Sequence, residues 1–357
     1  MTERGLFDII NLSSEERKHL KTQKENRMSK KLYYMIVDTE TATLPFSDEI
    51  ADKDANKKKR IAIARPLVYD FGYVIMERNG NIVGRKHWLV AEIFCVPEIF
   101  NTAYYHEKRP IYLEKIARGE ISVKPWNEIM KEFITDLNVV DYVGAYNSMF
   151  DFKKAIPFTE LYIQKLYSAD FYRWEEMQKN LCRKIANEPY QKKEKIFNGD
   201  YFQFRGENYP LFDLWGLACS TLLNKNNYKN MCLDYDMLTN SGEYFKTSAE
   251  TSYRYLCAQY DFAEAHTALE DAEIEAFILA KILKRGAIQT GISFFPFQKL
   301  GNTCEYVLNK KKVNPTHAMK VYSCMEKYLG DTDENDFSAY QRKIRNKMDS
   351  LMEFIKI

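Results

Sequence analysis

The chain has 357 residues, of which 45% are hydrophobic and 29% are charged, so it can bury a sizeable core as a globular protein. Its formal net charge of +2 at pH 7 is nearly balanced, so no overall basic field indicates nucleic-acid binding. The seven cysteines are scattered and never spaced as Cys-x-x-Cys, which argues against a zinc site and a disulfide framework and fits a reducing cytosol.

The first thirty residues are polar and charged, so no signal peptide is predicted. No apolar run approaches the length of a membrane span, so we expect no membrane contact. The expected location is the cytoplasm, or the host cytoplasm if the chain is phage-encoded.

The predicted globular domain begins near residue 31, after a charged arm at 1–30. Residues 33–37 are apolar and predict a buried strand that ends on Asp38 and Glu40. These two carboxylates should share one face, because strand residues i and i+2 point the same way. Buried neighbouring carboxylates repel, so a divalent metal ion is expected between them. The charged segment 48–60 has no period and predicts a loop.

A hairpin and the first helices follow. Two β-rich runs within 65–90 flank Asn79–Gly80, one of the strongest short signals for a β-hairpin. Residues 124–137 repeat apolar side chains at helical spacing and predict a helix packed on a sheet. Residues 141–156 predict a short strand that runs into a helix, and 157–208 indicate a mostly helical insertion.

The second half continues this alternation. Residues 210–223 predict a strand or loop and then a helix. Capping boxes, Thr247 with Glu250 and Thr267 with Glu270, predict the starts of two further helices. Residues 287–357 contain more helical patterning and predict a C-terminal helical extension. The fold class expected is therefore α/β, with a mixed β-sheet flanked by helices.

Three separated motifs contain the residue types of a two-metal phosphodiester hydrolase. They are Asp-Thr-Glu-Thr at 38–41, Asn-Ser-Met-Phe-Asp at 147–151 and His-Thr-Ala-Leu-Glu-Asp at 266–271. Four carboxylates can neutralise two metal ions, and a histidine that titrates near neutrality can take a proton from water.

Each motif alone has an ordinary explanation. The Asp-x-Glu pair occurs by chance in many proteins, Asp151 could be a helix N-cap, and a lone His266 is more often structural than catalytic. The three motifs in this order, each on a suitable predicted element, favour the catalytic interpretation.

With these motifs the chain resembles the DEDDh 3′–5′ exonucleases, the DnaQ-like family that includes proofreading and phage-type enzymes. That family reads Asp-x-Glu-Thr, Asn-x-x-Phe-Asp and His-x-Ala-x-x-Asp at its three motifs. The resemblance covers about residues 31–286 and implies an RNase H-like exonuclease fold. It covers neither the first 30 residues nor the C-terminal extension.

The resemblance also implies roles for the motif residues. Two Mg²⁺ or Mn²⁺ ions would be held by carboxylates, with Asp38 bridging both ions. Glu40 and Asp271 would help to hold one ion, and Asp151 would act on the other. His266 would be the general base.

Three further positions match substrate-binding sites of the family. The backbone at Thr41 would face the terminal 3′ nucleotide, Leu44 would wedge against the last base, and Asn147 would contact the substrate. The chain departs from the family at Ala42–Thr43, where Thr-Gly is usual, which leaves the path of this segment open.

The function implied is a metal-dependent 3′–5′ exonuclease acting on single-stranded DNA or frayed 3′ ends, in proofreading or DNA processing. The motifs leave open an exoribonuclease of the same fold, because the chemistry at phosphorus is the same. A polymerase-accessory or nucleic-acid-binding module without catalysis is the second alternative.

The protein partner that this function implies is a DNA polymerase or a sliding clamp. Residues 289–297 resemble a clamp-binding peptide, although packing of this apolar segment back onto the domain is the favoured interpretation.

Overall fold

The computed structural model describes residues 31–46, 65–187, 199–309, 314–330, 332, 334 and 337–355. The predicted N-terminal arm and the predicted 48–60 loop lie outside these ranges.

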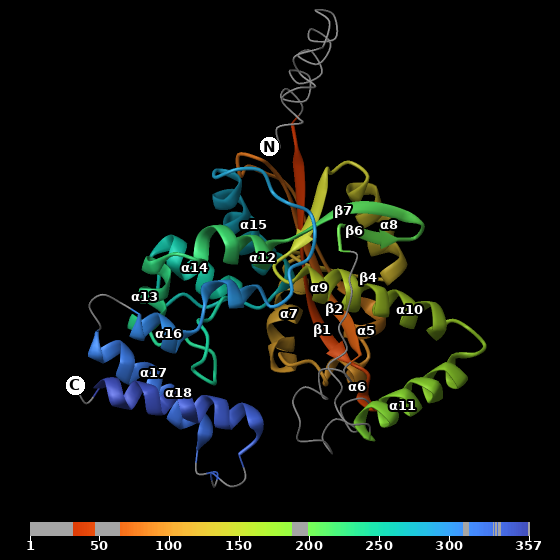
Figure 1. Cartoon of the computed structure of the whole chain (residues 1–357). Coiled ribbons are helices and arrows are strands. Elements are labelled where there is room, and N and C mark those ends of the chain that lie inside the picture. The colour runs from red at the N-terminus through yellow and green to blue at the C-terminus, as the bar shows by residue number, and fades with distance from the viewer. Residues whose placement is uncertain are drawn as a thin grey trace, which may run out of the picture.

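A seven-stranded mixed sheet with the order β4-β3-β2-β1-β5-β7-β6 forms the centre of the fold (Figure 1). Strand β2 is antiparallel to β1 and β3, and β6 is antiparallel to β7, whereas the pairs β1–β5, β5–β7 and β3–β4 are parallel. The predicted α/β class with a mixed sheet is confirmed. The strands are β1 Tyr33–Thr43, β2 Pro66–Glu77, β3 Ile82–Val90, β4 Ser122–Lys124, β5 Tyr142–Ala145, β6 Tyr201–Phe204 and β7 Glu207–Asp213.

Helices cover both faces of the sheet, with α12, α14 and α15 on one side and α8 and α10 on the other (Figure 1). The helices before β7 are α5 Ala91–Phe94, α6 Pro97–Phe100, η1 His106–Lys108, α7 Arg109–Ala117, α8 Trp126–Leu137, α9 Ser148–Phe150, η2 Asp151–Ala155, α10 Ile156–Leu166 and α11 Phe171–Asn187. Those after β7 are α12 Leu214–Ala218, η3 Cys219–Leu223, α13 Asn226–Asp234, α14 Ala249–Cys257, α15 Ala268–Leu283, η4 Pro296–Leu300, α16 Thr303–Leu308, α17 Pro315–Leu329 and α18 Ala339–Ile355.

Strand β1 separates two hydrophobic cores. Its side chains alternate, so Met35 and Val37 join the core on the α8 side and Tyr34 and Ile36 join the core on the α15 side. Burial on both faces explains why this strand is a continuous apolar run and does not alternate with polar residues.

The predicted hairpin and the predicted first helix are confirmed. Strands β2 and β3 flank the turn at Asn79–Gly80, where Gly80 has φ of 94° and donates its N–H to the Glu77 carbonyl at 2.9 Å. Helix α8 buries the predicted apolar stripe, which comprises Trp126, Ile129, Phe133 and Leu137.

Two element predictions need correction. The 157–208 segment contains α10 and α11 as expected, but it also contributes the edge strand β6, because Tyr201–Phe204 pairs with β7. Helix α14 begins one residue later than the predicted box: Ser248 is the N-cap and accepts a hydrogen bond from the Thr251 N–H. Both residues at this terminus can cap a helix, and the Ser248 side chain is the one aligned with the backbone donor.

The C-terminal segment is helical, as predicted, and packs into the core on the α15 side through α16, α17 and α18. Within it, Gly291 forms a β-bridge with Phe212, and the Phe297 ring stacks on Trp215 with centroids 6.0 Å apart. These contacts agree with the interpretation that residues 289–297 pack back onto the domain.

Helix α15 approaches β2 at a glycine. A Cβ atom added to Gly72 would lie 2.4 Å from the Leu269 nitrogen and 2.6 Å from the Ala268 carbonyl carbon. Gly72 pairs with Asp38 of β1, so the absent side chain lets the first turn of α15 lie beside the first motif.

We predict that Gly72→Ala lowers the free energy of unfolding by about 2 to 3 kcal/mol, because the added methyl group meets backbone atoms that cannot yield. Urea unfolding followed by circular dichroism measures the change. Gly84→Ala on β3 is the matched control: its Cβ would lie 3.5 Å from Ile75 Cβ, an ordinary contact, so less than about 1 kcal/mol is expected. Equal losses in the two variants would contradict the prediction.

Candidate active site

The first motif lies inside β1 and not at its end, which corrects the sequence prediction. Strand β1 continues to Thr43. Glu40 pairs with Asp70 of β2, but the next residue, Thr41, pairs with Val68, so the register shifts by one residue between them. Pairing continues past the two carboxylates because this irregularity absorbs one extra residue, and such bulges often re-aim side chains next to active sites. Asp38 and Glu40 share one face of the strand, as their spacing predicts.

The second motif lies on a helix that begins before Asp151. Asn147 is the N-cap of α9, and Asp151 begins the π-helical stretch η2, which continues into α10. Asp151 is therefore not an N-cap, and π-helical turns are frequent at functional sites. Its Oδ1 atom accepts a hydrogen bond from the Thr39 hydroxyl at 2.7 Å, which links the second motif to the first.

The third motif spans the start of α15. Thr267 is the N-cap, as predicted, but the backbone bonds of a capping box are not formed: its hydroxyl donates to the Glu270 carboxylate and makes no bond to a backbone N–H. His266 lies just before the helix and Asp271 in its first turn. The His266 Nδ1 atom lies 3.8 Å from the Asp271 Oδ2 atom.

The five predicted catalytic residues are carried by β1, η2 and the start of α15, and both η2 and α15 pack against β1. Ligand atoms of Glu40, His266 and Asp271 lie within 4.8 Å of one another. The charges of Glu40, Asp151 and Asp271 all raise the pKa of Asp38, whose side chain is half-buried.

Burial and mutual repulsion raise the pKa values of these carboxyl groups. Burial first, and neighbouring carboxylates second, raise the pKa of Asp38 well above its ordinary value. The same causes raise the pKa of Glu40 to about 8 and that of Asp271 to about 7. Burial also raises the pKa of Asp151 to about 7. A cluster of this kind needs protons or cations to balance its charge.

The donor set fits a metal ion. Carboxylate oxygens from separate elements meet here, and hard divalent cations prefer such ligands. Among the described residues, the Asp271 Oδ1 atom is buried without a hydrogen-bond partner, so a polar ligand is expected at this atom.

His266 is held in an unusual conformation beside the cluster. Its φ of 52° lies in the left-handed region, and its ring stacks on Tyr105 with centroids 4.4 Å apart. The Lys108 ammonium donates to the Ala265 carbonyl at 2.7 Å and lies 4.4 Å from the centre of the Tyr105 ring. Burial, and then the positive charge of Lys108, lower the pKa of His266.

Three acidic residues near the cluster belong to none of the predicted motifs. Glu275 is buried one turn after Asp271, accepts the Tyr146 N–H at 3.0 Å, and its charge raises the pKa of Asp38. Its i+4 spacing from Asp271 was the available signal. Burial, and then the charge of Asp271, raise the pKa of Glu264 to about 8. Asp70 lies opposite Glu40 on β2, and its position inside an apolar strand was the signal.

The three predicted substrate-binding residues lie around the same end of β1 and β5. Thr41 is half-buried on β1, Asn147 is exposed between β5 and α9, and Leu44 is buried in the core on the α8 side. Their contacts with a substrate stay predictions.

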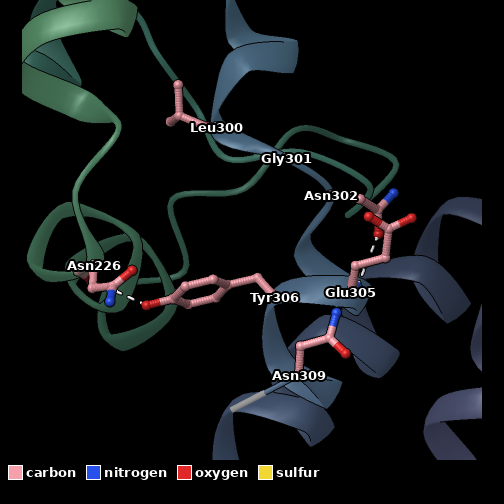
Figure 2. Close-up of a pocket in the computed structure, with 7 residues that line it drawn as sticks. All are labelled: Asn226, Leu300, Gly301, Asn302, Glu305, Tyr306 and Asn309. Carbon is pink, nitrogen blue, oxygen red and sulfur yellow. Dashed lines mark hydrogen bonds between the residues drawn. The ribbon is translucent and has the colours of Figure 1, made fainter.

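A separate pocket of about 450 Å³ contains none of the motif residues (Figure 2). It lies between the start of α13 and α16, where the Tyr306 hydroxyl reaches the Asn226 carbonyl at 3.3 Å. Its lining residues are Asn226, Leu300, Gly301, Asn302, Glu305, Tyr306 and Asn309.

Comparisons of the chain with protein-family models, with curated proteins and with solved structures found no match. In the part of the chain that the structure describes, none of the helices has the length and apolar character required to span a membrane.

The raised carboxyl pKa values predict how stability depends on pH. Carboxyls whose pKa is higher in the folded state bind more protons there, so the stability of the metal-free protein should fall as pH rises from about 4 to about 8. Differential scanning fluorimetry across this range, in EDTA, measures the change.

Mn²⁺ should reverse this loss of stability, and its effect should be larger near pH 8 than near pH 5. At a Mn²⁺ concentration 100 times the dissociation constant, the free energy of unfolding should rise by about 2.7 kcal/mol. Asp271→Asn should reduce the Mn²⁺ effect, whereas Glu273→Gln, on the same helix but paired with Arg85, should preserve it. An equal Mn²⁺ effect in the two variants would place the ion elsewhere.

Proposed function

We propose that this chain is a metal-dependent 3′–5′ exonuclease with an RNase H-like fold that acts on single-stranded or frayed DNA ends. The observation that carries the proposal is the convergence of the three motifs. The three motifs are far apart in the sequence, yet donor atoms of Glu40, His266 and Asp271 lie within 4.8 Å of one another. The charges of Glu40, Asp151 and Asp271 also raise the pKa of Asp38.

The strand order supports the fold part of the proposal. The sequence β3-β2-β1-β5-β7 has an antiparallel meander, β1 to β3, followed by two strands parallel to β1. This is the arrangement expected for an RNase H-like sheet, with β4 and β6 added at its edges.

The acidic residues support the metal part of the proposal. Asp38, Glu40, Asp151 and Asp271 would hold two Mg²⁺ or Mn²⁺ ions, and the buried Asp271 Oδ1 atom is available as a ligand. When bound, the ions would act as Lewis acids at the phosphate. The protein's own contribution is to hold these oxygens close together in spite of their repulsion.

His266 would act as the general base. Burial and the charge of Lys108 lower its pKa, which favours the neutral imidazole that can accept a proton from the attacking water. The stack on Tyr105 restricts rotation of the ring, which keeps one imidazole nitrogen directed at the carboxylates.

We predict that Asp38→Asn abolishes 3′–5′ degradation of a 5′-labelled single-stranded DNA, because the carboxylate central to the cluster is lost. The wild-type chain should produce a ladder shortened from the 3′ end in Mg²⁺ and none in EDTA. Glu273→Gln is the control and should behave as wild type, since this glutamate pairs with Arg85 at the surface.

An RNA of the same sequence, assayed in parallel, separates the two nuclease alternatives, and a faster rate on DNA is expected. No cleavage of either strand by folded protein would leave the binding-module interpretation, with a polymerase or clamp as the partner to test.

We further predict that His266→Ala lowers kcat by about 100- to 10,000-fold while Mn²⁺ binding changes far less, because the base is lost and the carboxylates remain. Single-turnover rates and calorimetric Mn²⁺ titration measure the two effects. His317→Gln removes an imidazole on α17 that bonds to Asp234, and it should leave kcat unchanged. A His266 variant with a normal rate would remove this residue from the mechanism.

A further inference from the structure

Asp70 is a carboxylate in the middle of β2 that belongs to none of the three motifs. Its side chain is fully buried, and the residues around it on the strand are mostly apolar and also buried. A buried carboxylate is costly unless it accepts several hydrogen bonds, so the origin of its donors indicates its role.

Asp70 has donors on three different elements. Its Oδ2 atom accepts from the Tyr112 hydroxyl of α7 at 2.9 Å and from the Ala268 N–H of α15 at 3.1 Å. Its Oδ1 atom lies 2.7 Å from Nε2 of His87 on β3. The carboxylate thus joins α7, α15 and the sheet at one point.

The bond to Ala268 replaces a missing helix cap. The Thr267 side chain makes no bond to a backbone N–H at the start of α15, so the Asp70 carboxylate satisfies the first N–H of the helix. A negative charge at this position also interacts favourably with the N-terminal end of the helix dipole.

The position of this bond connects it to the candidate active site. Asp70 pairs directly with Glu40 across β1 and β2, and Ala268 lies between His266 and Asp271 in the chain. The Tyr112 hydroxyl, which Asp70 holds, lies 3.5 Å from the His266 carbonyl. The Asp70 carboxylate therefore bonds to the start of the third motif and lies on β2 opposite the first motif.

We propose that Asp70 is a positioning residue of the nuclease site: it anchors the first turn of α15 so that His266 and Asp271 face Glu40. This inference rests on the proposed function for its catalytic consequence, whereas the anchoring itself is a structural statement. Asp70 acts through α15 and has no contact with substrate.

Four variants test the proposal in the full-length chain. Asp70→Ala removes the acceptor. Asp70→Asn keeps one oxygen for Ala268 and Tyr112 and turns an amide toward His87, which accepts it as the Nδ1–H tautomer. Asp136→Ala is the matched control. Asp136 lies on α8, and its carboxylate accepts the hydroxyl of Tyr73 on β2 at 2.7 Å. Asp38→Asn tests the proposed function itself.

Asp70→Ala should lower kcat on single-stranded DNA about 100-fold, with KM changed less than about threefold, because reacting groups are displaced by about 1 Å while the substrate surface is intact. It should also weaken Mn²⁺ binding and speed hydrogen exchange at the amides of residues 268–272. The kcat of Asp70→Asn should be at least about tenfold higher than that of Asp70→Ala.

A normal kcat in Asp70→Ala, an equal loss in Asp136→Ala, or no recovery in Asp70→Asn would overturn the proposal. If Asp70→Ala does not fold, Asp70→Asn decides it, with kcat expected about tenfold below wild type and exchange accelerated only at the start of α15. If wild type has no nuclease activity, the proposed function fails, and Mn²⁺ affinity and exchange rates alone decide the anchoring role.

Discussion

Repulsion among buried carboxylates is the constraint on which the rest of this structure depends. Asp38 lies among other acidic groups in a site partly removed from water, and burial and their charges raise its pKa well above normal. Such a cluster is unfavourable for folding unless protons or cations balance it, so the surrounding scaffold must be stable enough to hold it together. The scaffold has that capacity because β1 is buried on both faces and paired on both edges.

The site lies where the two hydrophobic cores meet, and each core supplies part of it. The core on the α8 side supports η2, because Phe152 and Ala155 are buried in it next to Asp151. The Asp151 carboxylate also accepts the Thr39 hydroxyl of β1. The core on the α15 side supports the third motif, and α17 and α18 add to the packing on that side. A change in either core can therefore alter the distances between carboxylates without touching them.

Two backbone features bring the motifs within reach of each other. Gly72 has no side chain between β2 and the start of α15, and His266 occupies the left-handed region immediately before that helix. Strained or crowded backbone of this kind persists only when surrounding contacts over-determine it. Here those contacts are the Tyr105 stack, the Lys108 bond to the preceding carbonyl and the Asp70 cap.

The sequence by itself determined the local elements and the chemical inventory. Residue spacing predicted the hairpin, α8, α15 and the five motif residues, because these depend on periodicity, turn chemistry and short motifs. Only the tertiary structure decided that β1 runs on to Thr43, that Asp151 lies in a π-helical stretch, and that Asp70 bonds to the start of α15. These depend on strand register and on bonds between residues as far apart as Asp70 and Ala268, which no local pattern in the chain encodes.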